Sequence, residues 1–171
     1  KPDRTALIQT NPHFLSINHL RPYPTWSSFL PMIRAGVEAC ANAAQPEAVV
    51  RVGLRYINRI EIPHPSVSLP EYFNIYPALV GELDHGFAAC IAGIRTVPPD
   101  PDGEIKIEIA TGQAAEGLLA LVLDLDRFIV SRSGMSIDES LAWLERTHGQ
   151  LVNTFEYCIT DKTRKLFGSP K

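Results

Sequence analysis

Hydrophobic residues between positions 25 and 44 recur at steps of three and four, which is the spacing of one face of an amphipathic helix. Thr25 is a suitable N-cap, and Pro46 cannot continue a helix. The pattern therefore predicts a helix over about 25–44. Its apolar stripe consists of Trp26, Phe29, Leu30, Ile33, Val37 and Cys40.

The chain before this helix has the pattern of a strand that a proline interrupts. Residues 5–9 and 14–18 are strand-like, and together they predict one bulged or bent strand, because Pro12 cannot sit in a central ladder. Two prolines within 21–24 then predict a turn that leads into the helix.

Residues 48–62 alternate between apolar and polar side chains, as a strand does when one of its faces is buried. Asn58 is a polar residue on the otherwise apolar face. The opposite face carries Arg51, Arg55, Arg59 and Glu61. This is the clearest strand in the sequence.

Three more strands are predicted over 87–97, 104–111 and 117–130, after a connection with one short helix near 69–73. Prolines and Gly103 predict a loop over 98–103. In the last of these strands, Asp124 and Asp126 share one face and three leucines share the other.

A capping box, Ser136 with Glu139, opens a long C-terminal helix. Its apolar stripe consists of Ile137, Leu141, Leu144, His148, Leu151 or Val152, and Phe155. The helix runs to about Ile159 or continues through a kink to Phe167. The order is strand, helix, four strands, helix. It predicts a single α+β domain over 1–171, an antiparallel sheet with the long helix packed on it. Both helix-grip and TATA-binding-protein-like folds share this order.

Composition excludes some classes of protein and favours others. The 171 residues are 45% apolar and 20% charged, which is typical of a globular domain. The net charge of −3 does not indicate a surface that attracts nucleic acid or an anionic membrane. No apolar run is long enough to span a bilayer. Three separated cysteines, Cys40, Cys90 and Cys158, predict buried free thiols and therefore a reducing, cytoplasmic location.

Three segments, in order along the chain, carry a family resemblance. The first is Leu7-Ile-Gln9 with Phe14 and Asn18; the second is Leu54-Arg-Tyr-Ile-Asn-Arg-Ile60; the third is His148, Phe155-Glu156 and Ile159-Thr160-Asp161. They resemble a sporadically distributed family of uncharacterised prokaryotic proteins, although His19 stands where that family usually has tryptophan. The resemblance implies a conserved hypothetical protein with no established activity, cofactor or catalytic residue. It also implies a further N-terminal stretch, so that this chain is the C-terminal part of a longer protein.

The stripe of Arg51, Arg55 and Arg59 is the most specific chemical feature of the sequence. Residues four apart on a strand lie about 13 Å apart on one face. That spacing could follow the phosphates or carboxylates of a partner. Alternatively, the arginines pair across the sheet with Asp124, Asp126 and Glu108.

Asn58 and His148 are polar residues on apolar faces, and each has two interpretations. Each either finds a hydrogen-bond partner inside the core or lines a pocket beneath the long helix. Asp124 and Asp126 could bind Mg²⁺, but the arginine stripe offers them a counter-charge.

The sequence contains no catalytic, metal-binding or phosphate-binding motif, so no cofactor or metal is expected. We expect a soluble binding or interaction domain whose partner is a protein or a small apolar ligand. It would act through Arg51, Arg55 and Arg59, or through a cavity beside Asn58 and His148. The alternatives are a helix-grip-type enzyme or ligand-binding protein, and a sheet that contacts nucleic acid.

Overall fold

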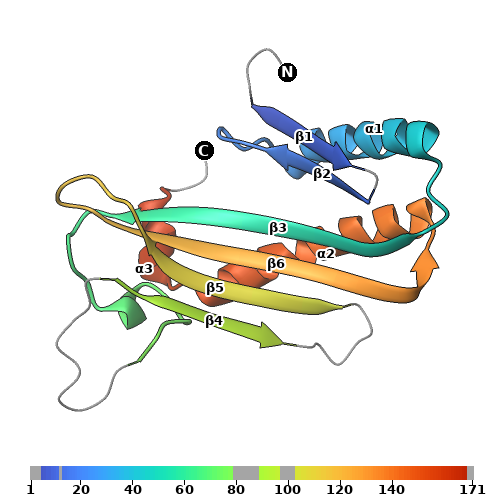
Figure 1. Cartoon of the computed structure of the whole chain (residues 1–171). Helices are drawn as coiled ribbons and strands as arrows, with labels where there is room; N and C mark the ends of the chain where they lie inside the picture. Colours follow the sequence, from blue (N-terminus) through green and yellow to red (C-terminus); the bar gives the residue numbers. More distant parts are fainter. Residues whose placement is uncertain (1–4, 12, 79–88, 97–102, 169–171) are drawn as a thin grey trace. The chain divides into compact units, whose positions relative to one another are not determined.

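A computed structural model describes residues 5–11, 13–78, 89–96 and 103–168, and Figure 1 shows its helices and strands. The chain divides into two compact units. The first lies within Lys1–Val50 and Ser131–Ala142, and the second within Arg51–Val130 and Trp143–Lys171. The α+β class predicted from the sequence is confirmed. The single-domain organisation stays a prediction.

The four strands predicted after the first helix form one sheet. Its order is β3 (Val49–Ile62), β6 (Leu119–Met135), β5 (Glu104–Gly112) and β4 (Ile91–Thr96). β5 is antiparallel to both of its neighbours. β3 runs opposite to β6, since Gly53 lies against Phe128 and Asn58 bonds to the carbonyl of Leu123.

Two strand boundaries differ from the prediction by more than two residues. β4 begins at Ile91 rather than at residue 87, although residues 87, 88 and 97 lie outside the described part of the chain, as does most of the predicted loop at 98–103. β6 continues to Met135, beyond the predicted end at residue 130. Residues 131–133 are polar on both faces, so the hydrophobic pattern could not indicate that the strand continues.

One face of the sheet is apolar and is covered by the second-unit part of helix α2 (Ile137–Cys158). Leu121, Leu123 and Leu125 on this face have no exposed surface. Burying one leucine side chain contributes roughly 1.5–3 kcal/mol. The helix buries Trp143 and Thr147 as well as the predicted Leu144 and Leu151, whereas Val152 remains 42% exposed. The predicted stripe was therefore too narrow.

The long helix ends where a second chain segment binds its terminus. The 3₁₀ helix η1 (Leu69–Glu71) leads into residues 72–74, and Phe73 forms a β-bridge with Ile159. The N–H of Asn74 donates to the carbonyl of Cys158 at 2.8 Å, and that of Thr160 donates to the carbonyl of Tyr72 at 3.0 Å. We call residues 72–74 and 158–160 the clasp. It separates α2 from the short helix α3 (Asp161–Leu166).

In the first unit, the prediction of one bent strand is wrong. Residues 6–19 form a hairpin of β1 (Ala6–Asn11) and β2 (Phe14–His19). The side-chain oxygen of Asn11 accepts the N–H groups of His13 and Phe14 at 2.8 and 3.0 Å, and this Asx turn reverses the chain.

The predicted helix of the first unit is confirmed as α1 (Trp26–Ala44), with Thr25 at its N-cap. Gly36 of this helix allows the hairpin to approach the helix closely. A Cβ at position 36 would lie 2.7 Å from the side chain of Ile17 and 3.8 Å from that of Ile8. The small residue therefore lets β1 and β2 pack against α1.

Candidate binding site

Arg55, at the middle of the predicted arginine stripe, is ion-paired on the outer face of the sheet. Its Nε donates to Asp124 Oδ1 at 2.8 Å and to Oδ2 at 3.1 Å, and its Nη2 also donates to Oδ2. These hydrogen bonds raise the pKa of the Arg55 guanidinium. The Asp124 side chain is only 13% exposed. The carboxylate predicted as a counter-charge is therefore engaged by Arg55.

Arg51 and Arg59 have partners on the same outer face. Arg51 Nη2 lies 3.9 Å from Asp126 Oδ2, and its guanidinium stacks 4.7 Å above the centre of the Phe128 ring. Arg59 Nη2 lies 2.9 Å from Glu61 Oε1 and also donates to the carbonyl of Gln113. The three arginines therefore form ion pairs within the chain, and their role in binding a partner stays a prediction.

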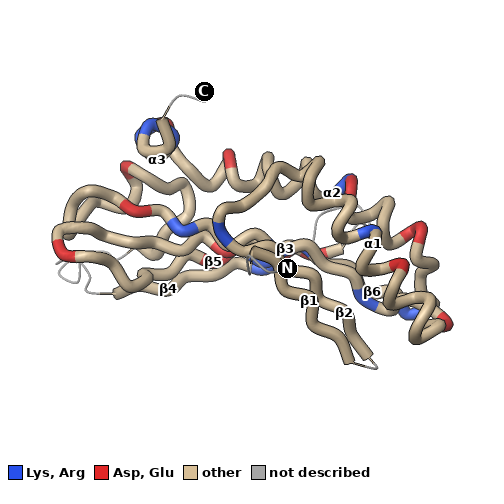
Figure 2. The backbone as a smooth tube through the Cα atoms, turned by 90° about the horizontal axis from the view of Figure 1, so that it is seen from above, with Lys and Arg blue, Asp and Glu red and all other residues tan. Residues whose placement is uncertain are grey.

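The rest of the outer face is equally balanced in charge. Lys106 pairs with Glu108 at 2.9 Å, and Arg95 pairs with Glu104. Figure 2 marks basic and acidic positions on the strands of this unit. Because each cation described here lies beside a carboxylate, this face offers little net attraction for an anionic polymer.

Asn58 lies on the inner face of β3, and His148 lies on the side of α2 that packs on that face. The amide of Asn58 donates to the carbonyl of Leu123 at 3.2 Å. Nδ1 of His148 is hydrogen-bonded to the hydroxyl of Tyr56 at 2.7 Å, and burial lowers the pKa of this imidazole. Both residues thus find partners inside the protein. Neither lines the groove described next.

A groove of about 540 Å³ lies between the C-terminal half of α2, the inner face of β4 and β5, and residues 74–78. None of its lining side chains is charged. They are Asn74, Ile75, Tyr76, Ala78, Ile94, Ile107, Thr154, Tyr157 and Cys158. Four separate segments contribute to it, so no motif in the sequence could have indicated it.

The Asn74 and Thr154 side chains of the groove are turned towards the backbone. The Asn74 amide donates to the carbonyls of Tyr157 and Ile159 at 2.9 and 3.1 Å, and the Thr154 hydroxyl donates to the carbonyl of Gln150. Burial raises the pKa of the Cys158 thiol to about 11. The exposed lining is therefore hydrocarbon and phenol, with Tyr157 77% exposed and Ile94 50% exposed.

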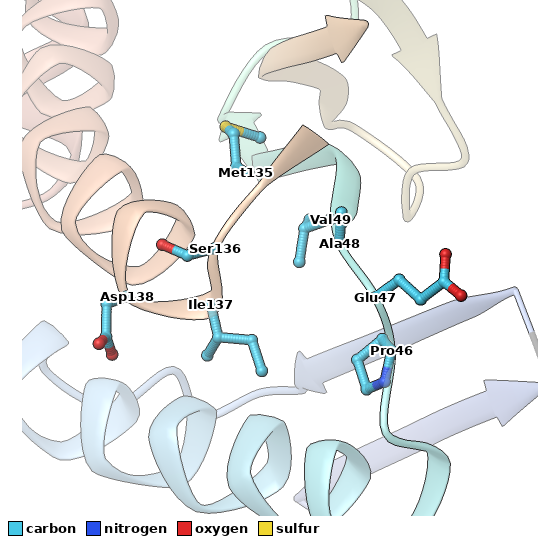
Figure 3. A pocket seen from close by; sticks show the side chains of 8 residues that line it. All are labelled: Pro46, Glu47, Ala48, Val49, Met135, Ser136, Ile137 and Asp138. Atoms are coloured by element: carbon cyan, nitrogen blue, oxygen red, sulfur yellow. The ribbon is translucent and has the colours of Figure 1, made fainter. Parts of the chain in front are cut away.

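A smaller pocket of about 270 Å³ lies in the first unit, between residues 46–49 and residues 135–138 (Figure 3). It lies at the start of α2, whose capping box is formed as predicted. Glu139 Oε2 accepts the N–H of Ser136 at 2.7 Å, and Ser136 Oγ accepts the N–H of Glu139 at 3.2 Å. The helix terminus is thus capped by its own side chains, so we assign no ligand to this pocket.

Arg127 is a polar residue of the inner face that the sequence analysis did not single out. It is 7% exposed, and its Nε has no hydrogen-bond partner within the described part of the chain. A β-strand places alternate residues on one face, so position 127 follows the three buried leucines at 121, 123 and 125. The alternation could therefore have identified it.

Within residues 5–11, 13–78, 89–96 and 103–168, no cluster of three or more metal-ligating side chains occurs. None of the described helices is long and apolar enough to cross a membrane. The segments that carry the family resemblance have structural contacts: Leu7, Gln9, Phe14 and Asn18 share one face of the hairpin, and Ile159 and Thr160 belong to the clasp. Membership of that family stays a prediction. No family model, no curated protein and no solved structure matches this chain.

Proposed function

We propose that the chain is a binding module, without catalytic activity of its own, that holds an apolar ligand in the groove beside β4. The groove carries this proposal. It has the volume of a small-ligand site, about 540 Å³, and an uncharged lining with exposed isoleucine and tyrosine side chains. An apolar ligand would remove these side chains from water, which is favourable in proportion to the area covered.

An enzyme of helix-grip type has less support. The Asn74 and Thr154 side chains are hydrogen-bonded to backbone carbonyls rather than directed at a ligand. A thiol with a pKa of about 11 is almost wholly protonated near neutral pH, so Cys158 is a poor nucleophile. The lining thus offers apolar contacts rather than an acid, a base or a nucleophile.

A nucleic-acid interface on the outer face also has less support. Arg51, Arg55 and Arg59 would each have to exchange a partner within the chain for a phosphate. Asp124 and Asp126 would then lie next to the incoming anion. Repulsion between these carboxylates and the phosphates would offset the favourable free energy that counterion release gives to nucleic-acid binding.

The test is binding of the apolar fluorescent dye anilinonaphthalene sulfonate to the whole chain and to two variants. Ile94→Asp places a carboxylate in the groove and should weaken dye binding by at least about tenfold, equivalent to about 1.4 kcal/mol. Ile57→Asp is the matched control, because Ile57 is 62% exposed on the opposite face of the same sheet. It should leave dye binding unchanged. Equal binding by the two variants would refute the groove as the site.

A further inference from the structure

We propose that the groove's ligand is an extended peptide segment of a partner protein, which adds as a strand to the outer edge of β4. This inference rests on the proposed function and names the chemical class of its ligand. The observations that carry it are the direction of the backbone groups of β4 and the charge of the groove beside that edge.

β4 is the last strand of the sheet, and half of its backbone groups point away from β5. The N–H of Thr111 donates to the carbonyl of Cys90 at 2.9 Å, which makes these two residues a hydrogen-bonded pair. In an antiparallel ladder such pairs alternate along the strand. Ala92 and Ile94 therefore direct their backbone groups towards β5. Ile91, Gly93 and Arg95 direct theirs outwards, and no described strand pairs with that edge.

Within Ile91–Thr96, this edge lacks two common protections against pairing, because neither lysine nor proline occurs there. Ile91 and Ile94 are 71% and 50% exposed. Edge strands with these features are templates for an added strand.

The groove determines which side chains the peptide carries. An added strand would direct alternate side chains to the inner face, beside Ile94 and towards Tyr157. Because the groove lining is uncharged, charge complementarity requires uncharged side chains at these positions, aliphatic or aromatic. Backbone hydrogen bonds with β4 would supply affinity and the groove would supply specificity, the division of roles found in strand-addition complexes.

The test on the ligand side uses a phage-displayed library of random linear peptides, matched in length to the six residues of β4 and selected on the whole chain. We expect selected peptides to have uncharged, apolar residues at alternate positions. One of them is then synthesised in two N-methylated forms, each blocking alternate N–H groups. Only the form that blocks the groups facing β4 should lose binding, by at least about tenfold. Equal binding by both forms, loss in both, or selection of no peptide would overturn strand addition.

The test on the protein side uses two substitutions of one residue. Gly93→Pro removes the outward N–H without removing a hydrogen bond to β5. It should weaken peptide binding severalfold, by about the 1 kcal/mol of one backbone hydrogen bond. Gly93→Ala is the control, since its Cβ would lie at ordinary contact distance, 3.6 Å, from the nearest atom, the carbonyl oxygen of Ile107. Equal peptide affinities would contradict the inference.

The dye distinguishes failure of this inference from failure of the proposed function. Dye binding that Ile94→Asp abolishes, together with no peptide binding, would leave the groove as a site for a small apolar ligand and overturn strand addition alone. No dye binding and no peptide binding would overturn both proposals.

Discussion

Tyr56 and His148 are hydrogen-bonded at 2.7 Å between the phenol oxygen and Nδ1, and this contact joins β3 to α2. Their rings meet edge to face, with centroids 6.1 Å apart. Burial lowers the pKa of the imidazole below its ordinary value of 6.5, so the fold favours the neutral ring. Burial of this ring therefore makes the attachment of the long helix sensitive to pH.

The first prediction concerns this sensitivity. Because the pKa of His148 is lowered in the folded state, the unfolded chain binds more protons than the folded chain as the pH falls through the ordinary histidine range. The free energy of unfolding should therefore decrease between about pH 7.5 and about pH 5.5. Urea denaturation at the two pH values measures this decrease, which should be smaller in His148→Gln. Tyr56→Phe should retain it, because burial rather than the hydrogen bond lowers the pKa. An equal decrease in His148→Gln and the unmodified chain would exclude His148 as its source.

The second prediction compares two ion pairs of the outer face. Arg55 and Asp124 are joined by several hydrogen bonds, whereas Arg51 and Asp126 approach only to 3.9 Å. Double-mutant cycles with alanine should give a coupling of about 0.5–1 kcal/mol for the first pair, reduced by salt, and close to zero for the second. Both arginines are more than half exposed, so solvent screening keeps both values small. A larger coupling for Arg51 and Asp126 would contradict this ranking.

The spacing of apolar residues predicts which residues share a face, because the geometry of a single strand or helix determines which of its side chains point the same way. The alternation in residues 48–62 correctly separated Leu54 and Ile60 from Arg55 and Glu61. The same pattern cannot identify what a segment pairs with. The pattern therefore predicts one bent strand where the structure has β1 and β2, since the turn between them depends on the single side chain of Asn11.

Long-range contacts set the features that the sequence did not reveal. α2 ends at Cys158 because residues 72–74, more than eighty positions earlier, bind its last turn. The groove is likewise assembled from four separate segments. The arginine stripe was visible in the sequence, but only the structure shows that Asp124 lies within reach of Arg55.

The third prediction concerns Arg127. It is buried on the inner face, and its Nε lacks a hydrogen-bond partner in the described residues. Replacing a buried charge with an apolar side chain of similar volume removes its desolvation cost. Arg127→Met should therefore raise the free energy of unfolding, by roughly 1–4 kcal/mol. Arg132→Met, at an exposed position of the same strand, should change it by less than about 0.5 kcal/mol. Destabilisation by Arg127→Met would show that the guanidinium has a favourable partner.

The last prediction tests whether the clasp holds one wall of the groove in place. The amide of Asn74 donates to the carbonyls of Tyr157 and Ile159, and the backbone N–H of the same residue donates to Cys158. Asn74→Ala removes the two side-chain bonds and should lower the free energy of unfolding by about 1–3 kcal/mol. It should also weaken binding of anilinonaphthalene sulfonate, because residues 74–78 line the groove.

Asn153→Ala is the matched control, because Asn153 lies on the exposed side of α2 and does not line the groove. It should change stability by less than about 0.5 kcal/mol and leave dye binding intact. If Asn74→Ala destabilises the chain but binds the dye with unchanged affinity, the clasp fixes the end of α2 without shaping the groove. If the two variants are equally stable, the side-chain hydrogen bonds of Asn74 contribute nothing to the free energy of unfolding. The groove wall is then held by the Phe73–Ile159 bridge and the backbone hydrogen bonds that flank it.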